Sequence, residues 1–264
     1  MTAHDHPLPQ APGKPGARPS GPVSPGLRAS ARMILGVVFV LAVAASLPAG
    51  FHPLLGPRVV VAASLVLAAI FGLVLHALPQ HGHGRFGYAN LVTAIRAAIA
   101  SFIAAVAVFA EITQAPDALV WVLVALVAVA LALDGVDGSL ARRYREESAL
   151  GARFDMEVDA FLILILSYAA LALGKAGWWV LAIGLMRYAF VAAMPLVPRL
   201  RGELPPSFRR KLVCVVQVAA LCLLLVPAIV PPVSTAIAAL ALVLLAYSFA
   251  VDVLYLMTAK AAGR

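Results

Sequence analysis

Charged residues are scarce in this sequence, which excludes an ordinary soluble domain. Of its 264 residues only 12% are charged while 63% are hydrophobic, and the mean hydropathy is +0.98. A soluble domain carries roughly twice that share of charged residues. The surplus apolar surface must therefore face a lipid bilayer rather than water. Backbone groups in lipid form their hydrogen bonds within their own segment, so we expect helices rather than strands.

Cysteines are equally few, and nucleic acid is a poor partner for the positive charge that is present. Cys214 and Cys222 lie in one apolar run, which gives neither a disulfide framework nor a zinc-binding spacing. The net charge is +8, but the basic residues lie between apolar runs, where membrane topology and anionic lipid headgroups explain them. We therefore expect membrane lipids as partners and no nucleic acid.

Apolar runs long enough to cross a bilayer are abundant. About eight of them follow residues 1–31, a Pro- and Gly-rich stretch with the composition of a disordered tail. We predict an all-α integral membrane protein with about eight transmembrane helices. The predicted spans cover residues 33–49, 58–78, 90–110, 118–141, 154–173, 178–198, 212–230 and 234–257.

The distribution of Lys and Arg predicts the orientation of the chain. If the N-terminus is cytoplasmic, only Arg58 and Lys175 face outside, and Arg96 and Arg187 fall within spans. All other Lys and Arg residues then lie in cytoplasmic segments, as the positive-inside rule requires. We expect both termini to be cytoplasmic and the active site to lie near the cytoplasmic face.

Four aspartates at the end of the fourth run and the start of the fifth are costly near a bilayer and need an explanation. Asp134 and Asp137 are three residues apart, and Asp155 and Asp159 four apart, so each pair shares one helix face. Residues 143–150 form a short connection, so we expect the two helices to be antiparallel neighbours whose acidic faces meet. Such carboxylates repel one another unless cations lie among them, and oxygen ligands suit Mg²⁺ or Mn²⁺.

A metal site of this kind beside a membrane indicates phosphate chemistry, because bound cations neutralise the charge of a pyrophosphate. Gly138 and Ala141 have almost no side chain, so a nucleotide can lie close to the helix there. Arg142 is placed to pair with a phosphate or to orient a carboxylate.

The segment resembles the signature of the CDP-alcohol phosphotransferase family of phospholipid-synthesising membrane enzymes. The match follows the pattern Asp134-x2-Asp137-Gly138-x2-Ala141-Arg142-x8-Gly151-x3-Asp155-x3-Asp159. The resemblance implies that the four aspartates hold Mg²⁺ or Mn²⁺, with two ions expected, and that Asp159 is the base for the attacking hydroxyl. It implies that the CDP site is shaped by the residues between them, Gly138, Ala141, Arg142 and Gly151.

The resemblance also implies a six-helix catalytic core, and family members often form homodimers. The chain then divides into a cytoplasmic tail at 1–31, two added transmembrane helices at 32–80, the core at 86–258 and a C-terminal tail at 259–264. The expected reaction is attack of an alcohol acceptor on the lipid-linked phosphate of CDP-diacylglycerol, with release of CMP.

Three alternatives stay open on the sequence. A small CDP-alcohol donor with a lipid acceptor fits the same signature. A divalent-cation transporter also carries acids in its membrane segments, although such acids belong at the bilayer midplane rather than at helix ends. A non-catalytic membrane partner protein is the third alternative, and the intact aspartate pattern argues against it.

Several residues outside the signature are candidates for substrate contacts. Asn90, followed by Thr93 and Arg96, is similar to the opening of the family's first core helix. Asn90 either contacts the nucleotide or is a helix cap, and Arg96 would then be an interfacial residue. Arg187, within the sixth run, either binds a substrate phosphate or pairs with an acid such as Asp252.

Two further groups lie near predicted turns. Arg210 and Lys211 open the seventh run, where the family often places a basic residue that meets an acceptor phosphate; the alternative is an ordinary positive-inside anchor. His76, His81 and His83 cluster in a connection that we expect to be a solvated loop rather than a zinc site.

Overall fold

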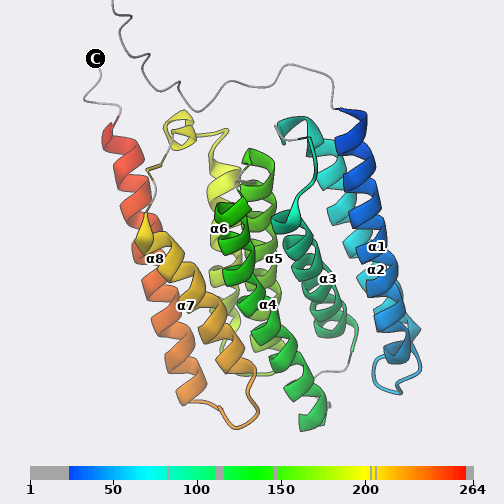
Figure 1. Cartoon of the computed structure of the whole chain (residues 1–264). Coiled ribbons are helices and arrows are strands. Elements are labelled where there is room, and N and C mark those ends of the chain that lie inside the picture. The colour runs from blue at the N-terminus through cyan, green and yellow to red at the C-terminus, as the bar shows by residue number, and fades with distance from the viewer. Residues whose placement is uncertain are drawn as a thin grey trace, which may run out of the picture.

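The fold is a single bundle of helices (Figure 1). The computed structural model describes residues 24–81, 84–110, 116–144, 148–202, 204–205 and 207–259, apart from the side chains at 80, 137–139, 141, 142 and 259. Within these ranges the chain forms eight α-helices and no strand. The helices are α1 (Pro25–Gly50), α2 (Gly56–Ala77), α3 (Tyr88–Phe109), α4 (Asp117–Tyr144), α5 (Ala149–Ala172), α6 (Leu181–Ala193), α7 (Phe208–Leu225) and α8 (Val233–Ala259). Short 3₁₀ segments in the connections are η1 (Leu78–Gln80), η3 (Trp178–Val180) and η4 (Pro198–Arg201).

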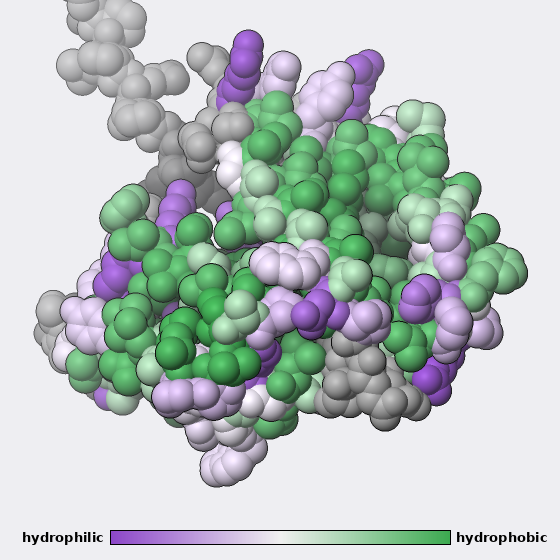
Figure 2. Space-filling model, turned by 90° about the horizontal axis from the view of Figure 1, so that it is seen from below, coloured by the Kyte–Doolittle hydropathy of each residue, from purple (hydrophilic) through white to green (hydrophobic). Residues whose placement is uncertain are grey.

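The predicted all-α membrane architecture is confirmed. Five helices, namely α1, α2, α3, most of α4, and α8, are long and apolar enough to cross a bilayer. Seen from below, hydrophobic side chains cover much of the visible surface (Figure 2). The predicted span at 178–198 is divided, because η3 precedes a 13-residue α6 that ends at Ala193. Pro195 and Pro198 follow at once, and proline disfavours continuation of a helix through the residue before it.

Helix α1 begins earlier than predicted, inside the stretch expected to be a disordered tail. Ser24 caps it, with its Oγ accepting a hydrogen bond from the Leu27 backbone N–H at 3.2 Å. Leu27 and Ala31 are buried, and the Ser30 Oγ accepts a hydrogen bond from the Phe86 backbone N–H at 3.1 Å. Contacts with residues distant in the sequence therefore order this segment, which its composition alone did not indicate.

Helix α3 lies at the centre of the bundle and packs against α1, α2, α4 and α5. One face of it consists of small residues, and Ala94, Ala97 and Ala100 are fully buried. Small side chains allow neighbouring helices to approach closely in a membrane. This close packing matters for function, because α3 brings one buried arginine between α4 and α5.

The two ends of the described chain lie on one side of the bundle. Helix α1 begins and α8 ends at the top of Figure 1, which agrees with an even number of crossings. At the opposite end, the buried Lys175 donates hydrogen bonds from Nζ to the carbonyls of Val226 at 3.1 Å and Ile229 at 2.7 Å. An ammonium beside the C-terminus of α7 satisfies carbonyl groups that the helix cannot pair itself.

Candidate active site

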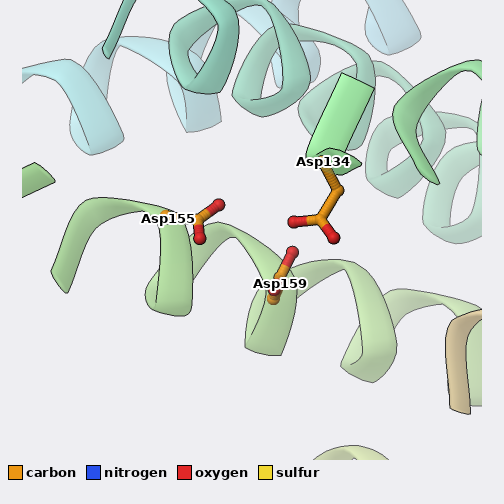
Figure 3. A group of neighbouring side chains, drawn as sticks. All are labelled: Asp134, Asp155 and Asp159. Atoms are coloured by element: carbon orange, nitrogen blue, oxygen red, sulfur yellow. The ribbon is translucent and has the colours of Figure 1, made fainter. Parts of the chain in front are cut away.

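Three of the four signature aspartates converge at one point. Figure 3 shows Asp155 and Asp159 on neighbouring turns of α5, with Asp134 of α4 pointing towards them. One carboxylate oxygen from each residue lies within 4.8 Å of the others. All three residues are partly buried, so the cluster is neither sealed nor freely solvated. The helix spacing predicted this meeting.

Neighbouring helices support this meeting of the two acidic faces. Within the described part of the chain, α4 packs mainly against α3 and α7, and α5 packs mainly against α3, α6 and α7. The acidic faces meet, because α3 and α7 hold the two helices at either side of the cluster. From α7, the Cys214 thiol donates a weak hydrogen bond to Oδ2 of Asp159, with sulfur and oxygen 3.6 Å apart.

Arg96 of α3 lies among the three carboxylates. Its Nη2 is 3.0 Å from Oδ1 of Asp134, and its two terminal nitrogens form ion pairs with Asp155 and Asp159. The Arg96 side chain is only 2% exposed, so the interpretation of this residue as interfacial is wrong. Its position six residues after Asn90, in a segment similar to the family's first core helix, was the signal that it belongs to the site.

Asn90 and Gly151 lie in direct contact beside the acidic cluster. A Cβ atom on Gly151 would be 2.8 Å from Oδ1 of Asn90 and 3.0 Å from Oγ of Ser148, so only glycine fits without displacement. Asn90 is buried, and its amide donates a hydrogen bond to the Phe86 carbonyl. Gly87 rather than Asn90 is the N-cap of α3. The structure therefore brings two of the predicted nucleotide-binding residues together.

His81 supports this corner of the site from the α2–α3 connection. Its Nδ1 is 3.0 Å from Oγ of Ser148, and its Nε2 is 2.8 Å from the Arg85 carbonyl. Ser148 in turn caps α5 by accepting a hydrogen bond from the Gly151 N–H at 2.9 Å. His81 is buried, so the expectation of a solvated loop is wrong for this residue. Long-range packing, which a histidine count does not reveal, places it here.

The other predicted residues of this segment are on α4. Asp137, Gly138, Ala141 and Arg142 belong to the last three turns of that helix, but their side chains lie outside the described part of the structure. Their roles in metal and CDP binding stay predictions.

A cavity of about 420 Å³ opens next to Asp159, between α5, α6, α7 and α8. Arg187 and Arg210, both predicted to bind a phosphate, line it together with Gln217. Within the described part of the chain, Oε1 of Gln217 is buried without a hydrogen-bond partner, while its Nε2 donates to the Ala241 carbonyl at 2.8 Å. The cavity thus combines two carboxylates, Asp159 and Asp252, with two guanidinium groups and a hydrogen-bond acceptor on largely apolar walls.

The ion pairs of these arginines differ from the alternative considered on the sequence. Arg187 pairs with Glu157, with Nη2 and Oε1 2.6 Å apart, and not with Asp252. Asp252 instead accepts hydrogen bonds from Arg209 at 2.5 Å and Arg210 at 3.3 Å.

Lys211, the neighbour of Arg210, has a different environment. Its side chain is exposed, and it is not among the residues that line the cavity. The structure therefore brings Arg187 and Arg210 together with Asp159, and leaves Lys211 outside.

Comparison with known proteins extends this assignment beyond the aspartate pattern. A family model described as CDP-alcohol phosphatidyltransferase matches residues 86–251, which is more than half of the chain. The chain belongs to the CDP-alcohol phosphatidyltransferase family. This confirms the resemblance seen in the sequence and places the chain in a class of transferases of phosphate-containing groups. The match starts just before α3, so α1 and α2 lie outside the phosphatidyltransferase region.

Curated relatives share part of this region. Two proteins from separate strains of Mycobacterium tuberculosis, each named "Probable phosphatidylglycerophosphate synthase", are 35% identical to this chain over 103 residues. The aligned segment covers 39% of this chain and 49% of each relative. The chain therefore spans about half the length of the curated relatives it matches. No solved structure matches the chain.

The donor set of this cluster fits a divalent metal. Asp134, Asp155 and Asp159 present only carboxylate oxygens, the ligands that Mg²⁺ and Mn²⁺ prefer. Against these three negative charges the described side chains place one guanidinium, that of Arg96, so negative charge remains in excess. In a partly buried site, a bound cation removes the repulsion that this excess creates.

Proposed function

We propose that this chain transfers the phosphatidyl group of CDP-diacylglycerol to a hydroxyl acceptor and releases CMP at the cytoplasmic face of a membrane. The single observation that supports it best is the convergence of Asp134, Asp155 and Asp159 at the edge of a cavity lined by Arg187 and Arg210. Membership of the family supports a CDP-linked donor. The transporter alternative gains no support from this geometry, since Asp159 borders a cavity with groups suited to phosphate.

Asp159 is the residue placed to act as general base. It is shared between the acidic cluster and the cavity, so its carboxylate can accept the proton of an acceptor hydroxyl held there. The hydroxyl oxygen forms a bond to the lipid-linked phosphorus, and the bond from that phosphorus to the CMP oxygen breaks. A divalent cation held by the aspartates, Asp137 included, supplies charge neutralisation for the pyrophosphate when bound.

The remaining residues position the two substrates. Arg96 holds Asp155 and Asp159 in place through its ion pairs. Asn90 and Gly151, which pack closely beside the cluster, contact the nucleotide together with Gly138, Ala141 and Arg142. These assignments follow the family signature residue by residue and are part of the proposal.

The acceptor class that this cavity favours is a phosphorylated polyol. The guanidinium groups of Arg187 and Arg210 suit a phosphate, and the unpartnered Oε1 of Gln217 suits a hydroxyl. The name of the matching relatives makes sn-glycerol 3-phosphate the first acceptor to test.

Product labelling tests this proposal. Purified protein is incubated with CDP-diacylglycerol, Mg²⁺ or Mn²⁺ and radiolabelled glycerol 3-phosphate, and lipids are extracted. Label in a phospholipid, dependent on both donor and metal, is the expected result. A parallel reaction contains a small radiolabelled CDP-alcohol and diacylglycerol. Labelled phospholipid from that reaction, with none from the reaction that contains CDP-diacylglycerol, would overturn the choice of donor. No transfer from either donor by folded protein would overturn the activity itself.

A further inference from the structure

A second site, separate from the acidic cluster, lies where α1 begins and α2 ends. A cavity of about 280 Å³ there is lined by Arg28, Arg32 and His76, with Leu75, Leu78 and Pro79. A larger one of about 570 Å³ lies between α2, α5 and α6 and shares His76 and Pro79 with the first. The two cavities therefore meet at the end of α2.

The larger cavity is apolar along most of its length and basic at its mouth. Its walls are formed by side chains of α2 and α5 such as Leu73, Val74, Phe154 and Phe161. Arg153, near the start of α5, joins His76 at the polar end. Together with the first cavity, this gives a rim of three arginines and one histidine above an apolar chamber.

The positive charge of this rim has no acidic partner in the described part of the chain. None of Arg28, Arg32 and Arg153 forms an ion pair there. The one acid lining the larger cavity, Glu157, is paired with Arg187 at 2.6 Å. The rim therefore attracts an anion from outside the chain.

This site is distinct from the transfer site. Arg153 and Glu157 are each two residues from an aspartate of the cluster, which places them about 200° away around α5. The smaller cavity is built from α1, α2 and η1, all of which lie outside the segment matched by the family model. The two added helices thus carry a feature that the catalytic core does not need for the transfer itself.

We propose that an anionic phospholipid of the surrounding bilayer binds here, with its phosphate at Arg28, Arg32, His76 and Arg153 and an acyl chain in the apolar cavity between α2 and α5. Arginine guanidinium groups bind phosphate through paired hydrogen bonds. Both α1 and α2 are long and apolar enough to cross a membrane, so a basic rim at their shared end lies at the depth of lipid headgroups. A membrane lipid matches both halves of the site at once, whereas a soluble anion matches only the rim.

Lipid binding to purified protein in neutral detergent tests the proposal. The melting temperature is followed during titration with dioleoyl phosphatidylglycerol, dioleoyl phosphatidylcholine or inorganic phosphate, without donor, acceptor or metal. We expect a saturable rise with phosphatidylglycerol only. The double variant Arg28→Gln, Arg153→Gln should bind it roughly tenfold or more weakly, because each arginine contributes separately to attraction of an anionic lipid.

Two further variants keep the test specific. Arg58→Gln removes one arginine charge at the opposite end of α2, away from the rim, and should bind lipid as the wild type does. Leu73→Trp fills the apolar cavity from a position that is 71% exposed, so it should fold normally and bind more weakly with all charges present.

Three results would overturn the proposal. They are an equal loss of binding in Arg58→Gln, wild-type binding by the double variant, and a full shift with inorganic phosphate alone. Because no substrate is present, the test is independent of the transferase reaction.

Discussion

Two charged clusters border the same cavity, and their compositions are opposite: one has an arginine among aspartates, and the other has an aspartate between arginines. In the first, Arg96 lies among Asp134, Asp155 and Asp159. In the second, Asp252 forms ion pairs with two arginines of α7. Asp159 and Asp252 both line the cavity between α5 and α8. One cluster has surplus negative charge and the other surplus positive charge.

The two clusters differ in which groups interact with their excess charge. In the second cluster the chain supplies the partners, because Arg209 donates to the Ser248 carbonyl at 2.5 Å and to its Oγ at 2.7 Å. Arg210 also donates to the Pro205 carbonyl. These bonds join α7 to α8 and to the preceding turn. In the aspartate cluster one guanidinium, that of Arg96, faces three carboxylates of the described residues, an arrangement that a bound cation would stabilise. The cluster in which carboxylates outnumber guanidinium groups among the described side chains is the one suited to bind a cation.

The largest expected effect separates the two clusters directly. Asp134→Asn and Asp155→Asn should each lower the transfer rate by about 10²–10³, since each removes one carboxylate ligand of the cation that would stabilise the reacting phosphates. Asp252→Asn should retain most of the rate and lower the melting temperature instead. CMP release at saturating Mg²⁺, on variants that elute as folded protein, measures both. Equal loss of activity in all three variants would contradict the distinction.

Removing the central arginine sharpens the comparison. Arg96→Gln leaves three carboxylates without their cation and should cost about 3–5 kcal/mol of stability in the absence of metal. Mg²⁺ should then raise the melting temperature of Arg96→Gln more than that of the wild type, because it takes over the missing charge. The matched variant Arg209→Gln should be destabilised without any added response to Mg²⁺. Melting curves with EDTA and with Mg²⁺ decide this, and an identical metal response in both variants would show that the aspartate cluster does not hold the metal.

A third variant tests the cavity between the clusters. Arg187→Gln should raise the acceptor KM about tenfold or more and change kcat little, as expected for a lost charge-assisted contact with a phosphate. Glu157→Gln is the matched control, because it removes the partner of Arg187 and leaves the guanidinium in place. Steady-state kinetics with glycerol 3-phosphate measure KM and kcat separately. The same KM increase in both variants would mean that Arg187 acts only through its ion pair.

The smallest expected effect concerns the contact of Asn90 with α5. Gly151→Ala places a methyl group 2.8 Å from Oδ1 of Asn90, so that side chain must move. We expect a severalfold increase in KM for CDP-diacylglycerol, with acceptor KM unchanged. Ala152→Ser, at the exposed neighbouring position, is the control. A donor titration with unchanged KM in Gly151→Ala would remove Asn90 from the nucleotide site.

The sequence predicted the acidic cluster because helix periodicity alone places Asp155 and Asp159 on one face. It also predicted the bundle, since apolar runs of bilayer length have few other folds. It could not predict that α3 and α7 are the helices packed against both α4 and α5, because periodicity fixes the face of a helix and not its neighbours. For the same reason the central position of Arg96 was missed.

The partners of other charged residues depend equally on tertiary packing. Arg187 was considered with Asp252 but pairs with Glu157, because α5 and α6 are adjacent in the bundle. The burial of His81 and the early start of α1 arise from contacts across the α1–α3 corner. None of these contacts has a signature in local sequence.

The central claim is that Asp159 accepts the acceptor proton within a metal-binding cluster. The most direct test is CMP release from CDP-diacylglycerol with Mg²⁺ or Mn²⁺, by wild type and Asp159→Asn, with and without glycerol 3-phosphate and other polyol acceptors. We predict acceptor-dependent CMP release by the wild type and a rate lower by a factor of about 10²–10⁴ in Asp159→Asn, with an unchanged melting temperature. Acceptor-dependent release at the wild-type rate by folded Asp159→Asn would contradict it.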